Sequence, residues 1–165
     1  MRTIPIVLAV VVLAAAGILA FMEVRGRERI RRNEREAFLA MKTLANAERI
    51  FRLDDLDDNG LVDYWTGDVA GLRVPQHLGG LFSAELAGAD AGRPNARPYH
   101  GYLLLALAGD DPKRFAFCAY PAEYGRSGRT TFIVNQARTV HACDTGGRPI
   151  FRWPNVPWAE FAKLD

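Results

Sequence analysis

Apolar and polar positions divide the first third of the chain into two halves that suit different solvents. The segment Ile4–Phe21 carries no charged side chain. At about 1.5 Å of rise per residue, a helix of this length reaches about 27 Å, close to the thickness of a bilayer's hydrocarbon core. Pro5 falls in the first helical turn, where its missing N–H is tolerated, and Gly26 is the one helix-weakening residue between Phe21 and Leu53. We therefore expect one long helix over Ile4–Leu53, apolar first and polar later.

The second half of this helix carries an apolar stripe. Apolar side chains recur three or four positions apart through residues 37–51, which predicts a helix face that packs on a core. Asp54, Asp55 and Gly60 are typical of the end of a helix. The stripe consists of Ala37, Ala40, Met41, Leu44, Ala47 and Phe51.

The last third of the chain alternates strand-like segments with turn residues. Apolar residues at every second position, such as Phe115 and Phe117, are typical of a strand with one buried face. We expect an antiparallel meander of about four strands with the long helix on one face, an α+β fold. We expect a short helix over Leu81–Ala87. We also expect the tail, Trp153–Asp165, to form a helical turn that packs against the rest of the head. The predicted strands are His100–Leu107, Arg114–Tyr120, Thr130–Asn135 and Thr139–Cys143.

These patterns divide the chain into four regions. Their composition changes from apolar to charged, then to rich in glycine and polar residues, and finally to strand-like. The predicted regions are a transmembrane anchor or signal segment (1–22), a charged and then amphipathic helix (23–54), a loop-rich region with an acidic loop (55–98), and an antiparallel sheet with a C-terminal tail (99–165).

The formal net charge of +2 conceals a dense run of charge after the apolar segment. Arginines and glutamates alternate between Glu23 and Glu36. A purely basic run would favour a nucleic-acid arm, but the interleaved acids and the adjoining apolar segment favour a solvated helix beside a membrane. We expect no nucleic-acid partner and a lipid bilayer in contact with Ile4–Phe21. The arginines are Arg25, Arg27, Arg29, Arg31, Arg32 and Arg35.

The sequence leaves the fate and the orientation of the apolar segment open. Arg2 and the small residues 14–16 or 18–20 fit a cleaved signal peptide. The length of the apolar run and the absence of a polar stretch after it fit an uncleaved anchor. Arginines are more numerous after the segment than before it, which by the positive-inside rule favours a head in the cytoplasm.

The strongest local motif is an acidic loop after the long helix. Oxygen-bearing side chains stand at alternate positions, Asp55, Asp57 and Asn59, and are followed by Gly60 and then Asp63. Alternating oxygen ligands with a glycine for the sharp turn are typical of loops that wrap calcium. The alternative is that these residues end a helix and build turns.

The closing position of this loop differs from a standard calcium loop. Thr66 stands at the twelfth position, where a bidentate glutamate is usual, and Asp68 is the nearest acid that could replace it. The predicted metal ligands are therefore Asp55, Asp57, Asn59, Asp63 and Asp68, in a weak calcium site.

The cysteines and histidines give no catalytic set. Cys118 and Cys143 could form a disulfide in an oxidising compartment, but their predicted strands flank a third, and alternate strands lie roughly 9–10 Å apart. Reduced thiols are the favoured interpretation. His77, His100 and His141 are scattered without ligand spacing. We expect a protein that is not an enzyme.

The chain resembles type IV pilin-like proteins, as in the pseudopilins of type II secretion. The resemblance rests on the apolar N-terminal helix, the run Leu44–Asp54, the acidic loop after it and the antiparallel sheet. It implies a single-pass protein of the cell membrane with its head outside the cytoplasm, self-association or secretion-system partners, and calcium in the head. In pilins a glutamate precedes the apolar run, whereas here Glu23 follows it.

A second resemblance covers Leu44 to the C-terminus. The pieces Tyr64–Gly71, Ala119–Gly125 and Thr131–Asn135 are similar to an uncharacterised family of bacterial exported proteins, many from planctomycetes. This resemblance implies export and brings no activity.

We therefore predict a membrane-anchored, extracytoplasmic structural or interaction protein. One alternative is an anchored, non-polymerising ligand-binding module, with a polar-aromatic patch around Tyr64, Trp65 and Tyr124. Another is a cytoplasm-facing protein whose arginine-rich helix meets anionic lipid.

Overall fold

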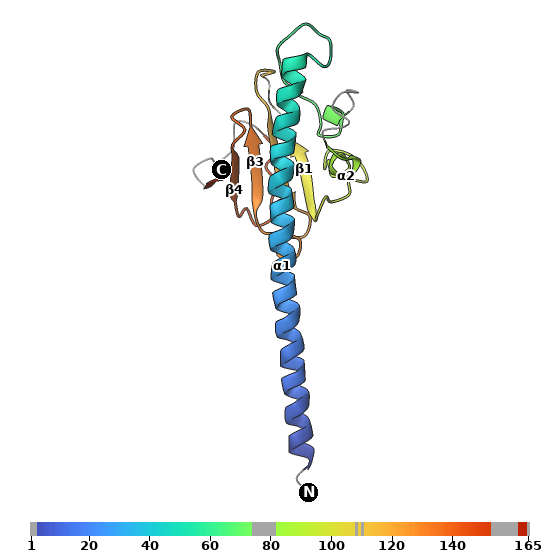
Figure 1. The fold of residues 1–165 in the computed structure, drawn as a ribbon, viewed down its shortest axis with the longest axis vertical. Coiled ribbons are helices and arrows are strands. Elements are labelled where there is room, and N and C mark those ends of the chain that lie inside the picture. Colours follow the sequence, from blue (N-terminus) through green and yellow to red (C-terminus); the bar gives the residue numbers. More distant parts are fainter. Residues whose placement is uncertain (1–2, 74–81, 108, 110, 153–161, 165) are drawn as a thin grey trace.

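A single long helix, α1 (Thr3–Asp54), runs the length of the molecule and carries the head on its second half (Figure 1). The computed structural model describes residues 3–73, 82–107, 109, 111–152 and 162–164, without the side chains of residues 3–12 and 15. The helix continues through Gly26, which confirms the prediction of one long helix, and it ends at Asp54, one residue after the predicted Leu53. Within the described residues, no helix is long and apolar enough to cross a membrane. The predicted anchor Ile4–Phe21 lies partly outside the described side chains and stays a prediction.

The sheet is an antiparallel meander in which each strand pairs with the next one along the chain. The prediction of four strands locates the first four correctly, and a fifth follows from the tail. Ala162–Leu164 pairs with the free edge of the fourth strand, so the predicted helical turn is wrong for these residues. An unpaired strand edge presents backbone N–H and C=O groups that a tail can satisfy. Residues 153–161 of the tail lie outside the described part. The strands are β1 (Tyr102–Ala106), β2 (Ala116–Pro121), β3 (Thr131–Asn135), β4 (Val140–Cys143) and β5 (Ala162–Leu164).

The main core lies between α1 and one face of the sheet. The whole predicted stripe of α1 is buried, from Ala37 to Phe51. It packs against the side chains that alternate inward along the strands, among them Phe117, Phe132 and Val134. The helix crosses the middle of the sheet in Figure 1, over β2 and β3. This packing sets the direction in which the first half of α1 projects from the head.

The opposite face of the sheet holds a smaller apolar cluster. Cys118 and Ile133 are fully buried there, with Leu107, and Ile150 packs over them. Alternate residues of β2 therefore belong to two different apolar clusters. Phe117 faces the helix, while its neighbour Cys118 faces away from it.

Two short elements close the side of the sheet next to β1. A 3-10 turn (Gly71–Arg73) precedes helix α2 (Ala84–Ala87), whose N-cap Ser83 accepts a hydrogen bond from the backbone N–H of Leu86 (3.2 Å). This locates the short helix that residues 81–87 predict. The chain then runs beside β1, where Ala91 N–H donates to Leu104 O (2.7 Å). The outer edge of β1 is therefore partly paired.

The packing of α1 predicts a matched pair of stability effects. Leu44→Ala removes a fully buried side chain from the helix–sheet core and should lower the free energy of unfolding by about 2–5 kcal/mol. Leu39→Ala, on the same helix at 45 % exposure, should change it by less than about 1 kcal/mol. Urea unfolding of the full chain in detergent, followed by tryptophan fluorescence, measures both. Equal losses for the two variants would contradict this orientation of the helix.

Candidate functional site

The acidic loop after α1 folds around its own first aspartate. Both carboxylate oxygens of Asp55 accept backbone hydrogen bonds, from Asn59 N–H (3.3 Å) and Gly60 N–H (2.9 Å). Asn59 in turn donates its side-chain amide to Asp57 (2.8 Å) and accepts from Leu61 N–H (2.7 Å). Gly60 has φ +73°, the left-handed conformation that a glycine adopts without strain. The loop is thus a set of side-chain-stabilised turns, with Asp55, Asp57 and Asn59 close together.

The remaining predicted ligands lie differently. Asp63 is near enough to Asp57 for its charge to contribute to a raised Asp57 pKa, after the larger effect of desolvation. Asp68 is engaged elsewhere, since its oxygens accept from Gly71 N–H and Arg93 Nε. Among the residues that the structure describes, no three His, Cys, Asp or Glu side chains are grouped so that they could hold a metal ion. Calcium binding stays a prediction that requires the loop to rearrange around the ion.

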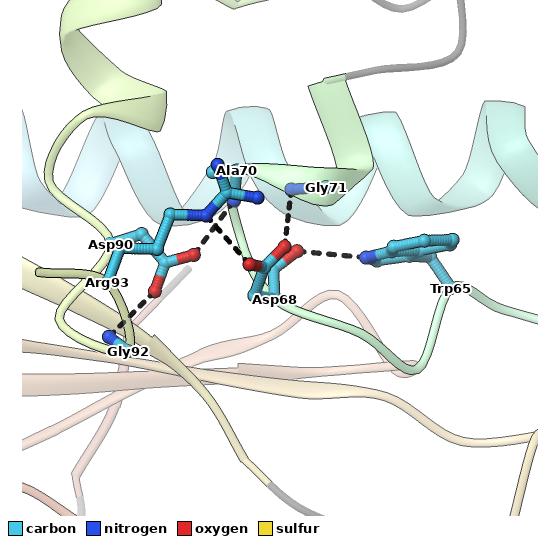
Figure 2. Close-up of polar contacts among 7 residues, drawn as sticks. All are labelled: Trp65, Asp68, Ala70, Gly71, Asp90, Gly92 and Arg93. Carbon is cyan, nitrogen blue, oxygen red and sulfur yellow. Dashed lines mark hydrogen bonds and ion pairs between the residues drawn. The ribbon is translucent and has the colours of Figure 1, made fainter.

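Asp68 belongs to a polar network that joins the loops beside β1 (Figure 2). Arg93 Nε donates to Asp68 Oδ2 (2.8 Å), and the indole N–H of Trp65 donates to the backbone carbonyl of Asp68 (2.8 Å). Buried Asp90 accepts from Ala70 N–H and from Gly92 N–H, both at 2.9 Å. Arg93 lowers the pKa of the Asp68 carboxyl through its hydrogen bond and its charge. The network satisfies backbone groups of loops that have no strand partner, so its role is to hold these loops in place.

Glu48 is an acid inside the apolar stripe of α1. Its side chain is fully buried, and Oε2 accepts a hydrogen bond from Trp65 N–H (3.0 Å). Oε1 has no partner within the described residues. Burial raises the Glu48 pKa from 4.5 to about 9, although the bond from Trp65 acts in the opposite direction. Glu48 is therefore protonated at neutral pH and ties the chain after the acidic loop to the helix.

A second acid fixes the other end of the packed helix. Glu34 Oε1 accepts from the backbone N–H groups of Arg129 (3.0 Å) and Thr130 (3.1 Å) and from the Thr130 hydroxyl (3.0 Å). The preceding residue, Asn33, donates its side-chain amide to Ser127 O in the same loop (2.9 Å). These contacts fasten the β2–β3 loop to α1 at the point where the helix leaves the head.

The three aromatic residues of the predicted patch do not meet. Tyr64 stacks edge-on against Phe115, just before β2, with ring centroids 4.9 Å apart. Trp65 contacts Phe51 in the same region. Tyr124 follows the other end of β2, is 47 % exposed and donates its hydroxyl to Asp144 (2.9 Å). The expectation of one polar-aromatic patch is wrong, because the length of β2 separates its members.

No disulfide joins the two described cysteines, Cys118 and Cys143. Cys118 lies opposite Ile133 in the register, and Cys143 lies opposite Thr131, so one strand separates them as the meander predicts. Burial raises the pKa of the Cys118 thiol to about 12, which keeps it protonated and unreactive at neutral pH.

Sequence reasoning overlooked the two glutamates that anchor the head to α1. Glu48 could have been found, since it falls at a core position of the stripe, four residues after Leu44 and three before Phe51. Glu34 gives no such signal among the alternating charges of its region, and its partners lie 95 and 96 residues away. That contact exists only because the sheet brings the β2–β3 loop to the helix.

The protonated state of Glu48 predicts a pH-dependent stability. The folded state holds this proton up to about pH 9 while the unfolded chain releases it near 4.5, so the stability contributed by protonation is full below 4.5 and is lost as the pH rises toward 9. Glu48→Gln keeps the acceptor for Trp65 N–H without an ionisable group. Melting temperatures between pH 5 and 9 should fall less steeply for this variant than for the wild type. Parallel curves would show that Glu48 is not protonated in the fold.

The calcium interpretation of the acidic loop predicts stabilisation by the ion. Calcium at about ten times its dissociation constant should raise the melting temperature by about 3–6 °C. Asp57→Asn should abolish the increase, whereas Asp111→Asn, in an exposed turn before β2, should retain it. The absence of a shift in the wild type, or an equal shift in the Asp57 variant, would leave the loop as a turn alone.

Comparison with known proteins gives one partial match. Residues 107–150 match a family described as a protein of unknown function (DUF2950). The matched segment includes β2, β3 and β4 and covers less than half of the chain, without α1. Searches of curated proteins and of solved structures find no match.

Proposed function

We propose that this chain is a membrane-anchored structural or interaction protein, pilin- or pseudopilin-like, whose head is held outside the cytoplasm on α1. One observation carries the proposal. The described side chains before Gly26 are all exposed, although several are large and apolar, among them Leu13 (72 %), Ile18 (60 %) and Leu19 (67 %). Water alone is a poor solvent for such a helix, because exposed apolar area on this scale is typical of a surface that lipid or another protein covers.

The junction between the projecting helix and the head supports an anchor of fixed direction. Full burial begins at Asn33 and continues to Phe51, and polar contacts from Glu34 and Glu48 fasten both ends of this part of the helix. A helix that is continuous from the apolar segment into the core transmits the direction of the anchor to the head. The bilayer is the proposed partner of Ile4–Phe21, with self-association or secretion-system proteins as further partners.

The resemblance to pilins is what supports a head outside the cytoplasm, while the arginines after the apolar segment favour the opposite side. The proposed role is not catalytic. Calcium in the acidic loop is part of the pilin-like proposal and is tested separately by the melting experiment above.

A topology measurement tests the proposal. A reporter that is active only outside the cytoplasm, fused after Asp165, should be active, and the protein should remain in the membrane at full-length mass. A reporter active only inside serves as the matched control. An inactive outer reporter, or a head released at reduced mass, would overturn the anchored, outward arrangement.

The alternative, an anchored module that does not polymerise, predicts the same topology. Exposed Leu39, on the side of α1 that the sheet leaves uncovered, distinguishes the two. A photo-crosslinking residue at position 39 should join copies of the chain in a pilin-like assembly, whereas one at exposed position 97 in the head should not. A monomer in both cases would favour the module.

A further inference from the structure

A groove lies where α1 leaves the head, and arginines from two distant parts of the chain line it. The groove has a volume of about 630 Å³ and is bounded by α1 between Glu23 and Glu34 and by the β2–β3 loop from Gly125 to Thr130. Neither Gly26 nor Gly125 has an atom within 4 Å of the position a Cβ would take, so the space beside both glycines is open. We call its arginines the basic collar: Arg27, Arg29, Arg31, Arg126 and Arg129.

Most of the neighbouring carboxylates are already occupied. Glu34 is held by N–H and O–H donors of the β2–β3 loop. Glu23 pairs with Arg27 (2.6 Å), and Glu123 pairs with Arg126 (2.9 Å). Within the part of the chain that the structure describes, no carboxylate lies within ion-pair distance of the remaining three arginines, Arg29, Arg31 and Arg129. The lining of the groove holds five arginines but only Glu23 and Glu34, with Glu123 beside it, so the collar keeps a net positive charge.

The collar surrounds the helix rather than forming a pocket for one small anion. Successive helical residues are about 100° apart, so Arg29 and Arg31 lie on either side of Ile30, which is half-buried and lines the groove. Arg129 approaches from the β2–β3 loop. Charges spread around a helix in this way suit a surface with many anions more than a single phosphate.

The collar lies along α1 just beyond the headgroup layer of a bilayer, which is about 5–8 Å thick on each side. If Phe21 marks the end of the hydrocarbon core, Arg27 to Arg31 lie about 9–15 Å further along the axis. Helical side chains lean toward the N-terminus, and arginine carries its guanidinium at the end of a long apolar stem. The guanidinium groups can therefore reach back to the lipid phosphates, which they bind in a bidentate manner.

We propose that the basic collar docks the base of the head on the phosphates of anionic phospholipids. The proposal rests on the membrane anchor proposed above and adds a second, charge-dependent contact made by the head itself. The anchor fixes the distance of the head from the bilayer, and the collar fixes its tilt on the surface.

The test uses the full-length chain in nanodiscs of phosphatidylcholine alone or with about 30 % phosphatidylglycerol. Amide hydrogen exchange of residues 122–130 reports the ratio of docked to free head. Exchange should be slower in the anionic discs, and about 0.5 M salt should remove the difference. Each basic residue near an anionic surface contributes roughly a fivefold factor, so Arg126→Gln with Arg129→Gln should lower the docked ratio about 30-fold.

The matched control removes two arginines elsewhere on the head. Arg114 forms an i,i+3 ion pair with Asp111 as Arg126 does with Glu123, and Arg97 is exposed as Arg129 is. Arg97→Gln with Arg114→Gln has the same net charge as the collar variant and should keep the protection. An equal loss in both variants would show a nonspecific effect of net charge and overturn the proposal.

Further arms identify the source of the anion. Protection by inorganic phosphate or by an oligonucleotide in phosphatidylcholine discs, without an effect of phosphatidylglycerol, would assign the collar to a different ligand and overturn the lipid proposal. Insertion into the discs is checked first by co-elution with the scaffold protein. A chain that does not insert fails the anchor and the collar together, whereas an inserted chain indifferent to phosphatidylglycerol fails the collar alone.

Discussion

The packing of one face of α1 on the sheet is the interaction on which the rest of the structure depends. Between Ala37 and Phe51 the helix has its apolar stripe fully covered, whereas the described residues before Gly26 have no cover from the head. The helix continues without a break from the uncovered segment into the part that packs on the sheet (Figure 1). The head and the projecting segment therefore share one helix axis. The direction in which the apolar segment points is therefore set by core packing in the head.

Two glutamates secure this packed segment at its ends by different physical means. Glu34 is partly exposed, and one of its carboxylate oxygens accepts hydrogen bonds from three donors of the β2–β3 loop. Glu48 is buried among apolar side chains, where the cost of removing a charge from water exceeds the gain from one backbone hydrogen bond. Glu34 therefore holds the loop through hydrogen bonds at the surface, whereas Glu48 is a neutral hydrogen-bonding group in the core.

The same arrangement explains why charge gathers at the base of the head. Five arginines line the groove against two glutamates, Glu23 and Glu34, so positive charge is in excess there. Arg126 and Arg129 are 95 or more residues from the arginines of α1 with which they share the groove, and only the docking of the loop brings them together. The contacts of Glu34 that hold the β2–β3 loop to α1 thus also bring arginines together where the helix leaves the head.

The sequence by itself determined the elements whose periodicity is local. The apolar stripe predicts the buried face of α1, and the alternation of Phe115, Phe117 and Ala119 predicts the inward face of β2, because helices and strands repeat over a few residues. Asp55, Asp57 and Asn59 are together as their spacing predicts, since all belong to one turn. Calcium binding and membrane insertion remain predictions that the fold leaves untested.

Tertiary structure alone decided the contacts between distant segments. Asp68 turns to Arg93 instead of the acidic loop, Tyr124 is separated from Tyr64, and the tail supplies a fifth strand. No local pattern encodes these outcomes, because each depends on which backbone and charged groups the folded sheet leaves without a partner. The sequence therefore predicts a long helix with a small α+β head, and the fold decides where its polar groups meet.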